Sequence, residues 1–367
     1  MIERQRIGLR LEKRDSVSIL VRVAVPVICI LAAFMCCAVI IGLQGFNPLE
    51  VYARLIKGAY GTAYSISESV LQGIPLMLCG LGVSMAFKMS INNIGAEGQY
   101  AMGAFAATAV ALFCPWIPKP LVLPAIMIAG FIGGAIWGML AVAPRAFMGV
   151  NETIVTLMFN YIALYWVDYW CYGPWRDSSG SNMPYTKVFP EYAQLPTLWD
   201  TRIHIGLIIA VIAAALIYMF YRFTVRGYQM RVIGTNVKAA RYAGMNINAN
   251  IMLVMLLSGG LAGLAGSSYV SGVVYRLQPN LPNGVGYTAI IIAYLAKFNP
   301  FLVLVVAVLF GGLTQGGYSV QIMGVSSRVV TMIQGGILFF VLAGEIFIRN
   351  RLVLIRTSNE VHKTEAE

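Results

Sequence analysis

The stretch 23–43, VAVPVICILAAFMCCAVIIGL, indicates the fold class of this protein. It carries no charged residue, and it matches the roughly 20 apolar residues that a helix needs to cross a bilayer. Basic residues precede it, as in a secretory signal peptide. The run is longer than the roughly 7–15 apolar residues of a signal peptide, and no small-residue cleavage site follows. We therefore predict a retained membrane-spanning helix.

The composition of the whole chain extends this prediction. Of the 367 residues, 59% are hydrophobic and 11% charged, and the mean hydropathy is +0.75. Soluble proteins carry about 45–50% apolar and about 25% charged residues. A soluble enzyme, a nucleic-acid-binding protein and a disordered chain are therefore poor interpretations. The chain is predicted to be an all-α polytopic membrane protein.

Apolar runs predict about ten transmembrane helices, at 23–43, 69–87, 99–114, 121–143, 153–172, 203–222, 249–273, 285–297, 301–319 and 328–348. They define a transmembrane domain at 23–348, between an N-terminal segment at 1–22 and a tail at 349–367. Residues 48–62 alternate charged and apolar side chains, which is typical of an interfacial helix.

The distribution of basic residues predicts the orientation. With ten spans, the segments on the side of both termini hold 18 Lys and Arg residues, and those on the other side hold 8. Because Lys and Arg concentrate on the cytoplasmic side, both termini and the flanking segments 1–22 and 349–367 are predicted to be cytoplasmic. Most of the net charge of +11 thus follows from topology.

Two connecting segments stand out. The predicted outer loop 173–201 is long and rich in Pro, Trp and Tyr. The predicted cytoplasmic loop 223–248 is purely basic, since no Asp or Glu occurs between Asp200 and Glu345. Within it, Asn236 precedes a helix-prone run that Gly244 ends, which predicts a short helix with an Asn cap and a glycine stop.

Polar residues gather where two predicted spans meet, in Asn92–Tyr100 (NNIGAEGQY). Ionisable groups inside a membrane domain are candidates for function. Alternatively, Asn93 and Glu97 only cap a helix at a cytoplasmic turn. A second set begins the fifth span, where Glu152, Thr156 and Asn160 share one helical stripe. That stripe could face a translocation path, or it could hold helices together by hydrogen bonds.

Further patterns add weaker information. Asn93-Ile-Gly95 resembles Asn283-Gly-Val-Gly286, and matched interrupted segments mark the substrate site in many transporters. Small residues four apart, as in Gly130/Gly134/Gly138 and Gly259/Gly263, predict close helix packing. No phosphate-binding loop, catalytic constellation or metal-binding pattern occurs, so neither catalysis nor a metal site is predicted.

Four stretches resemble, in the same order, the permease subunits of bacterial ABC importers for branched-chain amino acids, ribose, autoinducer-2 and nucleosides. They are NIGAEGQ at 93–99, GVNETIVTLMFNYIAL at 149–164, RVIGTNVKAARYAGM at 231–245 and GYTAIIIAYLAKFNP at 286–300. The resemblance runs from about residue 65 to 348, and the AEGQ version looks most like the nucleoside type.

The resemblance implies a type II-like importer fold in the bacterial inner membrane. The partners it implies are ATPase subunits that bind ATP and Mg, a second and usually different permease, and an external substrate-binding lipoprotein. It makes 223–248 the coupling loop, with Arg231, Gly234, Asn236, Ala240, Arg241 and Gly244 as coupling residues. The substrate path would include Asn93, Glu97, Gln99, Glu152, Thr156 and Asn160.

Two alternatives stay open at this point. The chain could be an ion-coupled secondary transporter, in which Glu97, Glu152 and Asp168 bind the coupling ion. The substrate of an importer could also be a simple sugar instead of a nucleoside, because the chain alone does not identify the solute.

Overall fold

The computed structural model describes residues 6–13, 18–178, 183–198, 201–326 and 328–357. Parts of the predicted terminal segments and of the predicted outer loop therefore lie outside the described residues. The chain divides into two compact units, one formed by Met1–Glu50 with Arg328–Glu367 and the other by Val51–Ser327.

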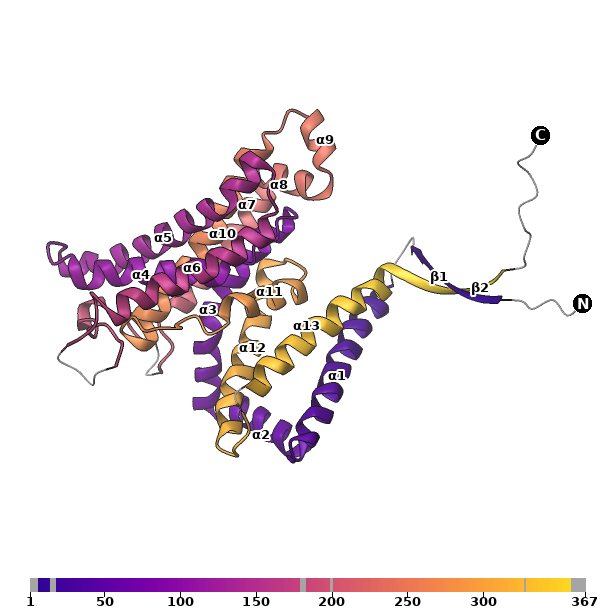
Figure 1. Cartoon of the computed structure of the whole chain (residues 1–367), viewed down its shortest axis with the longest axis horizontal. Helices are drawn as coiled ribbons and strands as arrows, with labels where there is room; N and C mark the ends of the chain where they lie inside the picture. The colour runs from indigo at the N-terminus through magenta and orange to yellow at the C-terminus, as the bar shows by residue number, and fades with distance from the viewer. Residues whose placement is uncertain (1–5, 14–17, 179–182, 199–200, 327, 358–367) are drawn as a thin grey trace, which may run out of the picture. The chain divides into compact units, whose positions relative to one another are not determined.

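The first unit is a helical hairpin of α1 (Ile19–Leu43) and α13 (Arg328–Arg349) (Figure 1). The two helices run antiparallel, because Cys37 lies beside Met332 whereas Cys29 lies beside Gly344. Beyond the helices, strands β1 (Arg6–Lys13) and β2 (Asn350–Thr357) pair antiparallel, an element that the sequence analysis did not predict. The start of α1 and the end of α13 therefore lie on the same side of this unit.

The second unit contains most of the chain. Its helices in chain order are α3 (Ala63–Lys88), α4 (Ala96–Phe113), α5 (Lys119–Met148), α6 (Glu152–Tyr172), α7 (Gly206–Phe223), α8 (Val225–Thr235), α9 (Val237–Tyr242), α10 (Ile247–Tyr269), α11 (Val285–Leu295) and α12 (Pro300–Gln321). A π-helical turn, η2 (Val270–Val274), continues α10. Helix α3 lies at the core, because 89% of an apolar 18-residue stretch of this helix is buried inside the protein.

Each predicted span coincides with a helix, but the count of ten spans is not confirmed. Among the described residues, six helices are long and apolar enough to cross a membrane: α1, α3, α5, α7, α10 with η2, and α12. Helix α11 has 11 residues, which rise about 16 Å, roughly half of the ~30 Å hydrocarbon core. The predicted interfacial segment is also a helix, α2 (Pro48–Tyr60), which buries Val51, Leu55 and Ala59 along one stripe.

The glycine patterns place two helices in backbone contact, as predicted. A Cβ added to Gly134 would collide with the carbonyl oxygen of Gly259, and one added to Gly263 would collide with that of Gly130. Helices α5 and α10 therefore cross where neither has a side chain. In lipid, such close approach supplies the dispersion contacts that hold helices together.

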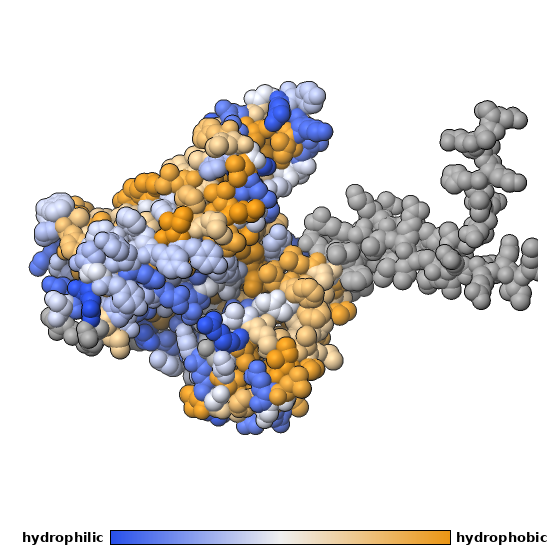
Figure 2. Space-filling view, viewed as in Figure 1, coloured by the Kyte–Doolittle hydropathy of each residue, from blue (hydrophilic) through white to orange (hydrophobic). Residues whose placement is uncertain are grey.

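Many large apolar side chains lie on the outside of the second unit. On α5, Ile128, Ile132, Ile136 and Leu140 are exposed at every fourth position, so they form one stripe. Figure 2 shows such apolar surface in orange over the helices. An apolar exterior of this extent is expected of a surface that contacts lipid or a second membrane subunit.

The predicted outer loop packs against the ends of several helices. Trp175 stacks on Phe105 of α4 with ring centroids 4.5 Å apart. Farther along, the backbone N–H of Phe189 donates to the carbonyl of Tyr275, and that of Leu195 donates to the carbonyl of Ser271. Arg202 forms an ion pair at 3.2 Å with Glu68, a buried carboxylate of α3. The described part of the loop thus joins α3, α4 and η2 at one end of the unit.

Candidate functional site

A buried polar junction forms where the chain passes from α3 into α4. Asn93 and Gln99 exchange two amide hydrogen bonds of 3.0 and 3.1 Å, and Asn93 also donates to Ser258 Oγ on α10 at 2.9 Å. The side-chain oxygen Oδ1 of Asn93 also accepts a hydrogen bond from the backbone N–H of Gly95. Because Asn93 and Gln99 have no exposed surface, these bonds fix the irregular segment before α4 against α10.

Glu97 holds the start of a different helix from its own. The two oxygens of its buried carboxylate accept the backbone N–H groups of Gly284 and Gly286, each at 2.6 Å. Gly284 precedes α11 and Gly286 lies in its first turn. A carboxylate is stabilised at a helix N-terminus by free N–H groups and by the helix dipole. Glu97 therefore caps a helix start, but that of α11; its position at a cytoplasmic turn and its role in the substrate path both stay predictions.

The stripe on α6 contacts the same segment. Thr156 Oγ accepts the N–H of Ile94 at 3.3 Å, and the Asn160 amide donates to the carbonyl of Ile94 at 2.8 Å. The side-chain oxygen Oδ1 of Asn160 accepts a hydrogen bond from the backbone N–H of Gly98 at 2.8 Å. The side-chain Nδ2 of Asn160 also donates to the Tyr287 hydroxyl at 3.2 Å. The predicted common face of Thr156 and Asn160 is thus confirmed, and it joins α6 to α4 and α11.

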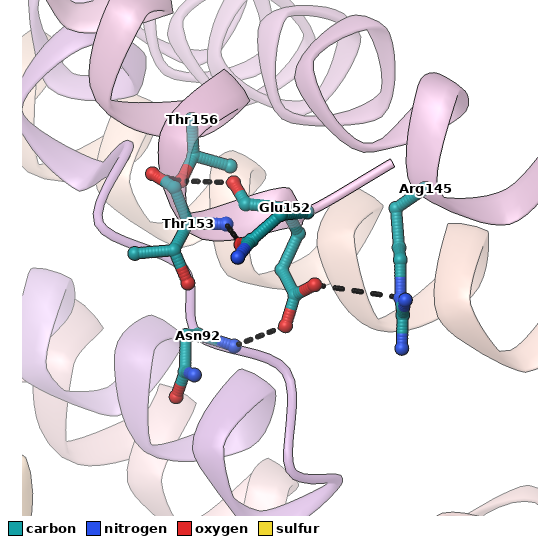
Figure 3. A network of polar contacts seen from close by, with 6 residues as sticks. Asn92, Arg145, Glu152, Thr153 and Thr156 are labelled. Atoms are coloured by element: carbon teal, nitrogen blue, oxygen red, sulfur yellow. Dashed lines mark hydrogen bonds and ion pairs between the residues drawn. The ribbon is translucent and has the colours of Figure 1, made fainter. Parts of the chain in front are cut away.

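Glu152 lies at the edge of the junction as half of an ion pair. Figure 3 shows its carboxylate between Arg145, whose Nε is 3.4 Å away, and the backbone N–H of Asn92, which donates to it at 3.4 Å. Arg145 belongs to the end of α5, and Asn151 caps α6 by accepting the N–H of Thr153. Glu152 therefore connects the α5–α6 turn to the segment before α4.

The junction lies well inside the helical unit. Asn160 is eight residues from the start of α6, so the first turns of α4 and α11 meet α6 about 12 Å along a helix of roughly 31 Å. Helix α11 begins there after a segment with three positive-φ residues, Asn280, Asn283 and Gly284. Helices α4 and α11 therefore both start part-way along α6, and interrupted helices are typical of the substrate sites of membrane transporters.

All six residues predicted for the path are buried, and the structure brings them into this one junction. Their bonds connect helices, whereas a role in a translocation path stays a prediction. The sequence analysis missed three of their partners, Arg145, Ser258 and Tyr287. Tyr287 is 38% exposed, so the junction reaches the surface of this unit at this side chain. Its sequence signals were its place directly after Asn283–Gly286 and within the stretch 286–300 that carries the family resemblance.

The predicted capped helix in the basic loop is confirmed as α9. Asn236 Oδ1 accepts the backbone N–H of Ala239 at 3.0 Å, and Gly244 follows the helix in the left-handed conformation with a φ of +72°. Ala240 is fully buried, whereas Arg241 is exposed and Tyr242 is 93% exposed. The residues before Asn236 form a second helix, α8, which the sequence analysis described only as loop.

Helix α8 contacts the segment that leads into the junction. Ser90 Oγ donates to the carbonyl of Gly234 at 2.9 Å. A Cβ on Gly234 would collide with the carbonyl oxygen of Lys88, so this glycine permits backbone contact between α8 and the end of α3. Asn93 follows Ser90 by three positions along the chain. The basic loop therefore contacts the segment that leads into the polar junction.

A comparison with known protein families identifies the family of this chain. The family described as "Branched-chain amino acid transport system / permease component" matches residues 65–342, which include the junction and both α8 and α9. The chain belongs to this permease family. The match begins in α3 and ends in α13, so it spans the order of helices described above.

Individual permeases are similar over nearly their full length. The chain is 32% identical to the guanosine ABC transporter permease protein NupP of Bacillus subtilis, with 86% of this chain and 92% of NupP covered. It is 30% identical to the nucleoside ABC transporter permease protein NupB of Lactococcus lactis, with 87% and 90% covered. The glucose ABC transporter permease protein TsgB13 of Haloferax volcanii is 31% identical, with 94% of each chain covered.

Proposed function

We propose that this permease is the membrane subunit of an ATP-binding-cassette importer and forms the path for nucleosides or related small polar solutes. The observation that carries the proposal is the contact between α8 and residues 88–90, because it brings a basic surface loop to the segment that leads into the polar junction. The names of NupP and NupB support a nucleoside substrate, and the name of TsgB13 makes a sugar the alternative.

Separate ATPase subunits, which bind ATP and Mg, would supply the energy at α8 and α9. Tyr242 supports this assignment, since an almost fully exposed tyrosine beside an exposed arginine is typical of an anchor for a protein partner. The remaining proposed partners are a second, different permease and an external substrate-binding lipoprotein. The basic residues of the α8–α9 loop support a cytoplasmic position for this loop and, if the chain crosses a bacterial inner membrane ten times, for both termini.

The path would pass the exposed side of the junction. Tyr287 lies there with its hydroxyl bonded to Asn160, and Asn160 in turn binds the backbone on both sides of Gly95. A hydroxyl and an amide match the hydrogen-bonding groups of a nucleoside, which is neutral and rich in hydroxyls. The other five residues would then act as positioning residues that hold α4 and α11 beside the path.

Reconstitution tests the function. The chain alone in proteoliposomes is expected to show neither ATP hydrolysis nor concentrative uptake. Together with its cognate ATPase, partner permease and binding protein, it is expected to take up radiolabelled guanosine when ATP is enclosed with the ATPase domains. Concentrative uptake by the chain alone, driven by a proton or sodium gradient, would establish the secondary-transporter alternative. Uptake of glucose or ribose but not of guanosine would establish a sugar substrate.

Replacing Tyr287 with phenylalanine tests the path. The change removes one hydroxyl and keeps the ring, so the assembly is expected to stay intact while the KM for uptake rises about three- to tenfold, the effect of one hydrogen bond. The Tyr165→Phe variant is the matched control, because Tyr165 is an exposed tyrosine of α6 one turn beyond the junction. An unchanged KM in Tyr287→Phe would remove Tyr287 from the path.

Removing the cap of α9 tests the coupling. The Asn236→Ala variant loses the bond to Ala239, which destabilises the start of this short helix by about 1 kcal/mol. We expect more ATP hydrolysed per nucleoside transported, while uptake at saturating substrate falls about fivefold. Asn236→Ser keeps a capping oxygen and is expected to restore most of the coupling. Equal coupling ratios in Asn236→Ala and in the parent chain would contradict this role.

A further inference from the structure

A basic cleft lies between the ends of α3, α7, α8 and α11 and the start of α12. It has a volume of about 310 Å³ and is lined by Lys88, Tyr218, Tyr221, Arg222, Arg231, Lys297, Phe298, Asn299 and Pro300. Four of these residues are cationic and none is acidic. The cleft takes no part in the polar junction.

The cations of the cleft have little to balance them. No Asp or Glu occurs between Asp200 and Glu345, and the two ion pairs that the described part of the chain shows involve Arg145 and Arg202. The N-terminus of the 22-residue helix α12 also lies at the cleft, and its dipole adds positive potential. The electrostatics of the cleft therefore favour an anion.

The wall of the cleft holds a buried donor without a partner. Tyr221 is 5% exposed, and its hydroxyl makes no hydrogen bond with any described residue. The Lys88 ammonium lies 4.0 Å from the centre of the Tyr221 ring. Leaving a buried hydroxyl unpaired is destabilising, so a ligand that accepts a hydrogen bond from it would remove this cost.

The side chains at the rim of the cleft indicate what kind of molecule would carry such an anion. Tyr218 and Phe301 are exposed with ring centroids 5.4 Å apart, and Tyr218 accepts a hydrogen bond from Arg222. Beside them, α7 and α12 expose apolar side chains: Val211, Ile212, Leu216, Met219, Leu302, Val305 and Leu309. A charged cleft bordered by aromatic rings and an apolar surface suits a headgroup followed by an acyl chain.

We propose that this cleft binds the phosphate of an anionic phospholipid, with the acyl chains lying on α7 and α12. Lys88, Arg222, Arg231 and Lys297 neutralise the phosphate, and the Tyr221 hydroxyl donates to one of its oxygens. Basic pockets between helices at the cytoplasmic surface are suited to anionic headgroups, since that leaflet carries anionic lipids. The assignment rests on the proposed orientation of the permease, but it is independent of the substrate.

Lipid binding to the isolated chain tests the proposal apart from transport. The purified 367-residue chain is mixed with phosphatidylglycerol or phosphatidylcholine in detergent, and bound lipid is measured by native mass spectrometry. We expect selective retention of phosphatidylglycerol. In the Arg222→Gln/Lys297→Gln double variant, its affinity should fall about 25-fold, or about fivefold for each charge removed near the surface. Lys238→Gln on α9, outside the cleft, is the matched control and should keep the parent affinity.

A second variant separates lipid binding from folding. Tyr221→Phe is expected to lower the affinity for phosphatidylglycerol about five- to tenfold, as expected for a lost bond to a charged group. Without lipid its thermal stability should hold or rise, because an unpaired buried hydroxyl has been removed. Unchanged retention in both cleft variants would overturn the proposal. Displacement of the lipid by millimolar inorganic phosphate would instead identify free phosphate as the ligand and overturn the lipid assignment.

Discussion

The Glu97→Ala variant is expected to lose uptake by more than about 100-fold, because two hydrogen bonds to one charged group, each worth roughly 1.5–3 kcal/mol, disappear together. Those bonds hold Gly284 and Gly286 at the start of α11. Without them, the N–H groups at a buried helix start lose their acceptors. Helix α11 is then expected to separate from α4.

Glu97→Gln tests whether both carboxylate oxygens are needed to hold the start of α11. A glutamine keeps the size of the side chain but offers one acceptor oxygen, and its amide group would face an N–H group, so we expect nearly the same loss of uptake as in Glu97→Ala. Uptake is measured with the fully reconstituted importer, and thermal unfolding in detergent is recorded beside it. Glu191→Gln, in the exposed turn of the outer loop, is the control. Uptake by Glu97→Gln within threefold of the parent chain would contradict the prediction.

The Gly263→Ala variant is expected to destabilise the permease by about 3 kcal/mol, at the upper end of the usual cost of overpacking. The added methyl group would collide with the carbonyl oxygen of Gly130 and with the backbone of Gly134. Backbone atoms cannot turn aside as a side chain can. Helices α5 and α10 would therefore have to separate along their crossing.

Gly335→Ala provides a matched comparison for this substitution. Gly335 also lies within a helix, but within its own unit no described residue stands within 4 Å of its added Cβ. A helical glycine replaced by alanine ordinarily gains about 1 kcal/mol. Thermal unfolding of both variants in the same detergent should therefore shift in opposite directions. A Gly263→Ala variant as stable as the parent chain would show that the close crossing does not hold the fold.

Local sequence patterns were sufficient to predict where helices form, but not how far each helix extends across the membrane. Each of the ten apolar runs coincides with a helix, and the Asn236 cap and the Gly244 stop were both confirmed. Periodicity and capping depend on neighbours within a few residues, so the chain itself shows them. Whether an apolar helix crosses the whole membrane depends on where it starts. The run 285–297 resembled a short span, whereas α11 has only 11 residues.

The sequence by itself determined that this protein is built for a membrane and has a basic, capped loop helix, because composition and short-range patterns specify both. It also determined which polar residues stand out from the apolar helices. Only the tertiary structure decided what those residues bind. Glu97 caps a helix start 187 residues away, and Asn160 joins Ile94 to Tyr287. A buried polar group must find partners, but which distant segment supplies them follows from how the helices pack.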